Sequence, residues 1–404
     1  MREPKAPHRT GDVRELRELG RILRLVASGQ AASRVDLASA TGLSRSTVSQ
    51  RVEVLLRRGV LEEIGNGRSS GGRRPVLLAL RDRAGVVLGA DVGATHCRLA
   101  VATLDGKIVV ARDEVLAVTD GPEPLLSGVT ESFAKLLKDS GRGPEDVFAI
   151  GMGVPGPVEF ATGTVVQPPI MPGWDGFEIP RWFKDHLDAP VVVDNDVNVM
   201  AIGEYLGGDH REPSLLFVKV STGIGCGIII DGAIHRGADG AAGDIGHVRV
   251  AEESDTLCTC GNTGCLEAVA SGSAIVHDLR DQGLDIGSVP DVVRLAQAGD
   301  PRVVRSVRSA SVKIGEVLAT LVSFYNPGSI VLGGTLAQLS DDLLAGIRSV
   351  IYSRALPLAT RRLRIEKTSL GSGAGIRGAV LLAAHHALEP AGLKRLADGA
   401  ASLS

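Results

Sequence analysis

Three of the five cysteines in this 404-residue chain lie within eight residues, in the stretch CTCGNTGC that begins at Cys258. Cys258, Cys260 and Cys265 offer three thiolates, and His247, 11 residues before Cys258, is the nearest histidine. One imidazole and three thiolates make a closed tetrahedral set of the kind that holds structural zinc. Because such a set leaves no position for an activated water, we expect a structural metal and not a catalytic one. The alternative is a group of three reduced surface thiols.

A second group of side chains that could do chemistry ends an apolar run. The sequence VVVDND predicts a buried strand that finishes at Asp194, Asn195 and Asp196. The carboxyl end of such a strand is where α/β proteins hold ligands. Asn195 and Asp196 could bind sugar hydroxyls, and Asp196 could accept a hydroxyl proton during phosphoryl transfer. The alternative is helix capping, and capping by Asp194 is compatible with ligand binding by Asp196.

Three glycine-rich turns could present backbone N–H groups to phosphate. The turns in GADVGATH and VSTGIGCG each lie between two predicted strands and are followed by an Asp-Gly turn, which indicates two related lobes. The third, in SIVLGGT, joins a strand to a helix. An ordinary tight turn is the alternative for each. A dinucleotide-binding fold is disfavoured because a strand follows the second turn where that fold needs a helix. The candidate phosphate contacts are Gly93, Thr95, Thr222, Gly223 and Gly334.

The elements at the start of the chain predict a winged helix-turn-helix. Residues 14–28 have helical apolar spacing, Ser33 and Ser44 are candidate N-caps of two further helices, and a glycine-containing turn separates those helices. Two predicted strands with a Gly/Ser/Arg tip resemble a wing. Polar and basic side chains on the outer face of the second capped helix and on the wing are typical of groove and phosphate contacts. These candidates are Arg45, Ser46, Thr47, Ser49, Gln50, Arg51, Arg68, Arg73 and Arg74.

The charge distribution separates this module from the rest of the chain. Residues 1–80 hold 15 Lys/Arg and 8 Asp/Glu, or +7, so the remaining residues hold 29 and 39, or −10. A basic module on an acidic body indicates an anionic partner for the module alone, and we expect operator DNA. A small helical protein-interaction domain is the alternative.

The composition indicates the cellular compartment and the chemical state of the clustered cysteines. The N-terminus has no apolar signal segment, and no run reaches the length of a membrane span, so we expect a cytoplasmic protein with no membrane partner. In that compartment, clustered cysteines favour a metal over a disulfide.

The segments VSTGIGCGIIIDGAIHRGADGAAGDIGH and CTCGNTGCLEAVASG resemble the signature and zinc motif of the ROK family (repressors, open reading frames and kinases). With the module at its front, the chain resembles the bacterial xylose and N-acetylglucosamine repressors of that family. The resemblance implies an α/β fold: a winged helix-turn-helix, then a two-lobed actin-like body of the sugar kinase and Hsp70 type with a structural zinc site. It also implies His247 and the three clustered cysteines as zinc ligands. The implied sugar contacts are Asn195, Asp196, Asp244, His247 and Glu267.

The chain departs from the kinase pattern at several positions. Asp244 stands where the kinases usually have Glu, Ala94 and His96 stand in a turn that commonly reads Gly-Gly-Thr-Lys, and Cys226 replaces a usual glycine. These side chains add bulk beside the expected phosphate positions. ATP with Mg²⁺ is therefore expected only under the alternative function.

We expect a DNA-binding module at residues 1–80, a first lobe at 81–195, and a second lobe at 196–404 whose final helix returns to the first lobe. The predicted function is a sugar-responsive transcriptional regulator, most commonly a repressor in this family, of carbohydrate uptake or metabolism genes, which acts as a homodimer or tetramer. The alternatives are an ATP-dependent, glucokinase-like sugar kinase with Asp196 as its base, and a zinc-stabilised scaffold without a ligand.

Overall fold

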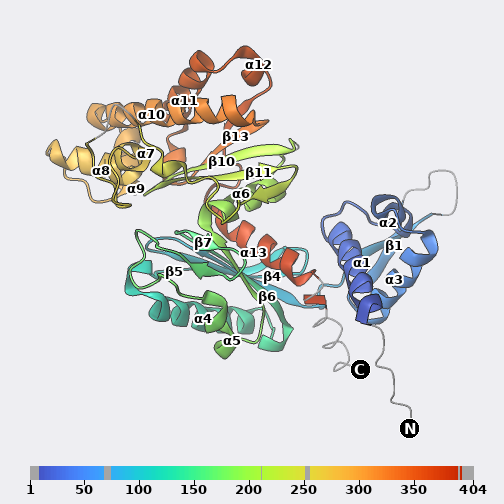
Figure 1. The fold of residues 1–404 in the computed structure, drawn as a ribbon. Coiled ribbons are helices and arrows are strands. Elements are labelled where there is room, and N and C mark those ends of the chain that lie inside the picture. The colour runs from blue at the N-terminus through green and yellow to red at the C-terminus, as the bar shows by residue number, and fades with distance from the viewer. Residues whose placement is uncertain (1–8, 68–73, 211, 251–254, 390–391, 394–404) are drawn as a thin grey trace, which may run out of the picture.

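The computed structural model describes residues 9–67, 74–210, 212–250, 255–389 and 392–393. A small N-terminal domain lies beside one of two α/β lobes, and two helices lie where the lobes meet (Figure 1). None of the described helices is long and apolar enough to cross a bilayer.

The N-terminal domain has the predicted winged helix-turn-helix order. Its helices and strands are α1 (Arg9–Ala27), α2 (Arg34–Thr41), α3 (Arg45–Arg57), β1 (Leu61–Asn66) and β2 (Val76–Leu80), with the strands antiparallel. Both predicted N-caps are confirmed: the hydroxyl of Ser33 accepts from the N–H of Asp36, and that of Ser44 accepts from the N–H of Thr47 at 3.1 Å. Gly42 ends α2 with φ of 70°, a left-handed conformation that suits glycine.

The two lobes repeat one sheet topology, which confirms the predicted duplication. The first sheet has the order β5-β4-β3-β6-β9 and the second β12-β11-β10-β13-β14. In each, three antiparallel strands are followed by two parallel ones. The strands of the first sheet are β3 (Val86–Val92), β4 (Cys97–Thr103), β5 (Ile108–Glu114), β6 (Val147–Val154) and β9 (Val191–Asn195). Those of the second are β10 (Ser214–Val220), β11 (Ile224–Ile230), β12 (Ala233–His235), β13 (Ser329–Gly333) and β14 (Arg364–Lys367).

Helices cover the outer face of each sheet and bury an aliphatic core. The first lobe carries η1 (Val118–Asp120), α4 (Pro122–Asp139), η2 (Pro144–Asp146), α5 (Ile179–His186) and the small hairpin β7 (Val158–Glu159) and β8 (Thr164–Val165). The second carries η3 (Ile245–His247), α7 (Leu266–Ala270), α8 (Gly272–Asp281), α9 (Val289–Gln297), α10 (Pro301–Tyr325), η5 (Thr335–Gln338), α11 (Ser340–Arg354), α12 (Pro357–Thr360) and η6 (Gly371–Gly373).

Two helices join the lobes, α6 (Asp196–Gly207) and α13 (Ala374–Ala387). Helix α6 packs on β10 and β11 of the second sheet, whereas α13 packs on β3 and β6 of the first. The helices cross with their backbones in contact: a Cβ added at Gly378 would overlap the carbonyl of Val199, and one added at Gly203 would overlap the carbonyl of Ala374. Glycine at both positions therefore permits this close crossing.

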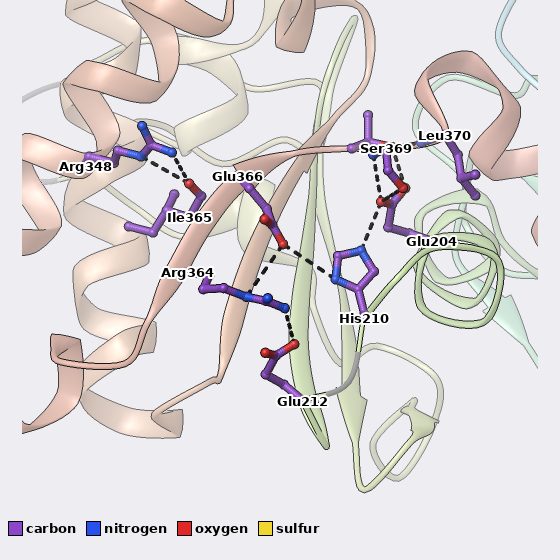
Figure 2. A network of polar contacts seen from close by, with 10 residues as sticks. Glu204, His210, Glu212, Arg348, Arg364, Ile365, Glu366, Ser369 and Leu370 are labelled. Atoms are coloured by element: carbon purple, nitrogen blue, oxygen red, sulfur yellow. Dashed lines mark hydrogen bonds and ion pairs between the residues drawn. The ribbon is translucent and has the colours of Figure 1, made fainter.

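A buried carboxylate ties α6 to the loop that leads into α13 (Figure 2). Glu204 accepts hydrogen bonds from the Thr368 hydroxyl, from the N–H of Ser369 at 2.8 Å and from Nε2 of His210 at 3.1 Å. The other ring nitrogen of His210 lies 3.6 Å from a Glu366 carboxylate oxygen on β14. The network connects three segments of the second lobe next to the crossing helices.

The winged helix-turn-helix packs on the end of α13. Arg24 of α1 donates to the carbonyl of Leu388 at 3.2 Å, just after the last residue of α13. One turn earlier, a Cβ added at Gly20 would lie 2.5 Å from the carbonyl oxygen of Leu388 and 3.0 Å from the Leu393 side chain. Helix α13 thus contacts both lobes and leads directly to the N-terminal domain (Figure 1).

We expect Gly378→Ala to lower the free energy of unfolding by about 1–3 kcal/mol, because the new methyl group must push α13 away from α6. Chemical denaturation of the full chain measures the change. Gly373→Ala is the matched control, since a Cβ there meets no atom within 4 Å. Equal stability of the two variants would contradict the close crossing.

The buried hydrogen bonds of Glu204 predict that the free energy of unfolding depends on pH. Burial acts to raise its pKa, but the hydrogen bonds from Thr368, Ser369 and His210 outweigh burial and lower the pKa below 4.5. Because the folded pKa is below the unfolded one, the stabilisation is present above the unfolded value and is lost as the pH falls through the folded value. We expect Glu204→Gln to be less stable by about 2 kcal/mol at neutral pH. Its deficit should shrink in acid, while the exposed Glu131→Gln should match the wild type throughout. A deficit that does not change with pH would contradict this role.

Candidate functional site

The four predicted metal-ligand side chains converge on one point. Ligand atoms of His247, Cys258, Cys260 and Cys265 all lie within 4.8 Å of one another. The Sγ atoms of Cys260 and Cys265 are 3.7 Å apart, and Sγ of Cys258 is 3.6 Å from Nδ1 of His247. A tetrahedral zinc ion with Zn–S of about 2.3 Å and Zn–N of about 2.0 Å gives edges of about 3.8 and 3.5 Å. The donor set and its spacing therefore fit zinc.

The thiols differ in their readiness to ionise. The backbone N–H of Asn262, helped by the neighbouring thiols and His247, lowers the pKa of Cys260 to about 7. Burial and the adjacent sulfur atoms raise the pKa of Cys265 to about 12. Zinc binds thiolates, so a metal at this position would be taken up with release of protons. It would join η3 to the loop before α7 and leave no ligand position for a reacting water.

Glu267 connects the metal loop to the second glycine turn. Its carboxylate accepts from the N–H of Ile224 at 2.9 Å, and a Cβ added at Gly223 or Gly246 would meet the same carboxylate. Glu267 lies in the first turn of α7, two residues after Cys265. The metal cluster thus positions a carboxylate against the turn between β10 and β11.

Asp244 immediately precedes the short helix η3, and His247 is its last residue. Nε2 of His247 is 4.0 Å from a carboxylate oxygen of Asp244, and the Asp244 side chain is 54% exposed. His247 therefore turns Nδ1 toward the cysteines and Nε2 toward Asp244. One imidazole can serve a metal and a ligand pocket together.

The junction of β9 and α6 corrects the predicted cap. Asn195, and not Asp194, is the N-cap of α6: its side-chain oxygen accepts from the N–H of Val197 at 2.9 Å, and its amide donates to the carbonyl of Gly156 at 3.0 Å. Asp194 is buried and pairs with Arg236 at 2.7 Å. That ion pair bridges the lobes, because Arg236 follows β12. A buried carboxylate such as Asp194 needs a partner that compensates for its desolvation, and Arg236 is that partner. The neutral amide of Asn195 is therefore the group that caps α6.

Asp196 forms an ion pair with Lys219, a residue that the sequence reasoning missed. Lys219 is the one charged residue of the apolar strand β10, and a lone lysine in such a strand is the signal that could have revealed it. Asp91, the penultimate residue of β3, is the strand partner of Gly153, and a Cβ added at Gly153 would lie 3.4 Å from Cα of Asp196. Burial and the nearby charge of Asp196 raise the pKa of Asp91 to about 6, and Lys219 and Arg98 oppose that shift.

Other groups of the chain pack against all three glycine turns. In the first turn the N–H of Gly93 donates to the carbonyl of His96 at 2.8 Å, and the His96 ring packs against Gly93. The second and third turns meet, since the hydroxyls of Ser221 and Thr335 are 2.9 Å apart. Gly334 has φ of 86° and packs on the carbonyl of Val220. Thr95 and Thr222 are exposed.

The candidate DNA contacts divide into two groups. Arg45, Ser46 and Gln50 are exposed on α3, and Thr47 and Ser49 are half-buried on the same helix. Arg51 points elsewhere: its guanidinium donates to Glu18 at 3.0 Å and to Glu15 at 2.8 Å, which holds α3 against α1. Arg74 is exposed at the start of the second wing segment, and Arg68 and Arg73 lie outside the described residues.

A surface hollow of about 330 Å³ lies on the first lobe, away from these groups. Its walls are Gly176, Phe177, Glu178, Arg181, Trp182 and Asp185. None of the predicted site residues lines it.

Comparison with known proteins extends over nearly the whole chain. Residues 87–386 match the ROK family, and residues 19–62 match a winged helix-turn-helix DNA-binding family. The xylose repressor of Caldicellulosiruptor bescii is 29% identical over 375 residues, which cover 89% of this chain and 94% of that protein. The glucokinase of Halalkalibacterium halodurans is 31% identical over 306 residues, 72% of this chain and 92% of that enzyme. A crystal structure of a ROK family transcriptional regulator, a homolog of the Escherichia coli MLC protein, shares the fold with a TM-score of 0.80, 22% identity, and coverage of 96% and 100%.

We expect the purified chain to contain stoichiometric zinc and Cys260→Ser to lose it, because three ligands hold the ion far more weakly than four. Elemental analysis after dialysis measures the metal content, and the melting temperature of the variant should fall. Cys97→Ala is the control, since Cys97 is buried in β4 outside the cluster. Zinc retained by Cys260→Ser would contradict the assigned ligands.

Proposed function

This chain belongs to the ROK family, and on that premise we propose that it is a sugar-responsive DNA-binding repressor of carbohydrate uptake or metabolism genes. The observation that carries the proposal is the direct packing of a winged helix-turn-helix on α13, the helix that also crosses α6 between the lobes. A ligand that changes the relative position of the lobes would act on a helix that leads to the DNA-binding domain.

The DNA-binding role rests on α3 and on charge. Exposed Arg45, Ser46 and Gln50 lie in the first turns of the second helix of the helix-turn-helix motif, the segment that enters a major groove in such domains. The net charge of +7 on residues 1–80 supplies attraction to phosphate. Arg74 on the wing is a further phosphate contact in this proposal. Operator binding by a homodimer or tetramer stays a prediction.

We assign the sugar to the region where the lobes meet. Asn195, Asp196, Asp244, His247 and Glu267 carry the carboxylate, amide and imidazole groups that bind hydroxyls. They come from the β9–α6 junction, η3 and α7, so a sugar held by all of them would contact both lobes. The zinc, in this proposal, is structural and keeps His247 and Glu267 in place.

Coupling requires that the sugar bind one lobe arrangement better than another. The contacts of Arg24 and Gly20 with Leu388 would then carry a movement of α13 to α1. In a protein with two such domains, a small rotation would change the spacing of the two recognition helices and so the affinity for an operator.

ATP-dependent phosphorylation of a sugar is the second candidate, favoured by the 31% identity to a glucokinase. Asp196 would be its base. We propose that the chain lacks this activity, because His96 packs into the first glycine turn and Asp196 is already paired with a lysine.

We expect the full chain to bind DNA from upstream of its own gene, with an affinity that falls steeply with salt and is reduced by one member of a sugar panel. Fluorescence anisotropy measures both effects. Arg45→Ala should weaken DNA binding by about tenfold or more and leave sugar-induced thermal stabilisation intact. Asp196→Asn should keep DNA binding and lose the sugar response.

Arg361→Ala is the matched control, since it removes an exposed arginine of the second lobe and should leave DNA binding unchanged. Absence of salt-sensitive DNA binding would overturn the regulator. ADP release with any sugar of the panel, abolished by Asp196→Asn, would establish the kinase instead.

A further inference from the structure

Lys219 lies on β10 between two glycine partners, where the Phe217 ring packs on Gly333 and the Val197 side chain packs on Gly225. Its partners in the two neighbouring strands are both glycines, Gly225 in β11 and Gly333 in β13. Residues opposite each other in a sheet project on the same face, so Lys219 has no side chain directly opposite it in either strand. The Lys219 side chain is 22% exposed and reaches Asp196 at the N-terminus of α6.

The ammonium of Lys219 lies among carboxylates from both lobes. It pairs with Asp196, and Asp91 of β3 acts on it as well. Burial acts to lower the pKa of Lys219, but the charges of Asp196, Asp91 and Glu267 outweigh burial and raise it. Lys219 is therefore a cation at neutral pH. Asp91 in turn lies against the backbone of Gly375 in the first turn of α13, so the group spans three elements that meet between the lobes.

Two facing carboxylates in a partly buried position need a cation, and a divalent metal is a common solution. Here a side chain supplies the charge. A metal–nucleotide would have to displace the ammonium from Asp196 and leave it without its partner, which is costly in a site of low solvent access. A neutral sugar can bind without displacing the Lys219 ammonium from Asp196.

A second cation at the junction, Arg236, is already paired too. Arg236 pairs with buried Asp194 through two nitrogens, and its guanidinium also covers the Phe160 ring at 3.5 Å. An anionic ligand would therefore meet two cations that are already neutralised, together with the carboxylates of Asp91, Asp244 and Glu267. The charge balance favours a ligand without negative charge.

We propose that Lys219 is a specificity-determining residue whose ammonium takes the place of a divalent cation between Asp91 and Asp196, so that the region where the lobes meet accepts an uncharged sugar and excludes metal–nucleotides and sugar phosphates. The inference rests on the proposed sugar site. It deepens that proposal, since it names the charge class of the effector and assigns a reason for the loss of nucleotide binding.

The test is a gain of metal binding. Mn²⁺, Mg²⁺ with a non-hydrolysable ATP analogue, and glucose 6-phosphate are each added to the full zinc-loaded chain, and binding is followed by calorimetry and by the melting temperature. We expect none of the three to bind the wild type. Lys219→Gln removes the charge at similar length, and we expect it to bind Mn²⁺ at least about tenfold more tightly than the wild type, with a matching thermal stabilisation.

Three variants make the result specific. Lys219→Arg keeps the charge and should not bind Mn²⁺. Lys219→Gln combined with Asp91→Asn should lose the gained affinity, and Lys107→Gln, at an exposed hairpin lysine, should resemble the wild type. A merely structural role of Lys219 would lower stability without creating a metal site.

The proposal is overturned if Lys219→Gln folds and gains no Mn²⁺ binding, or if the wild type binds any of the three probes where the lobes meet. If Lys219→Gln does not fold, binding of any probe to the wild type would still overturn the proposal. Because these titrations need neither DNA nor the natural effector, their failure is distinct from failure of the regulator proposal, which the operator-binding experiment tests.

Discussion

The crossing of α6 and α13 is the contact on which the remaining arrangement depends. At Gly203 and Gly378 the two backbones touch, and each helix packs on the sheet of a different lobe. A side chain at either glycine would separate the helices and with them the lobes. The groups with functional chemistry lie at the ends of these helices: Asp196 begins α6, Asp91 lies against the first turn of α13, and Leu388 follows its last turn.

Under the proposed function, paired charges at the lobe junction give a kinase-like fold another purpose. Lys219 with Asp196, and Arg236 with Asp194, neutralise two buried carboxylates from within the chain. A kinase must keep such a carboxylate available to a substrate proton and bring a metal to the phosphates. In the proposal, internal pairing would keep the hydroxyl-binding groups at the lobe junction in place and change the ligand that they can take.

Local patterns predicted much of the fold and of the site. Cysteine spacing predicted the metal cluster because its ligands, apart from His247, lie in one loop. Repeated Gly-turn and Asp-Gly signals predicted the duplicated sheets, and Ser33 and Ser44 predicted helix starts. What could not be predicted depends on tertiary neighbours. Asn195 is the N-cap of α6 because Asp194 forms an ion pair with Arg236, which lies 41 residues after Asn195 in the chain. The sequence of α3 predicts Arg51 as a DNA contact, but in the fold α1 places Glu15 and Glu18 beside its guanidinium. The importance of Lys219 is visible only in the fold, where Asp196 of α6 pairs with it.

The contact of α1 with Leu388 and Leu393 also bears on how the chain is made. The DNA-binding helices are synthesised before the two lobes, and their buried residues, such as Ile22, Leu37 and Val52, belong to one apolar cluster with Val87 of the first lobe and Val380 of α13. The surface on which α1 docks is synthesised after both lobes. The contact of α1 with Leu388 and Leu393 therefore forms only after both lobes have been synthesised. A chain shortened before Leu388 would present the DNA-binding helices without their connection to the helix that crosses between the lobes.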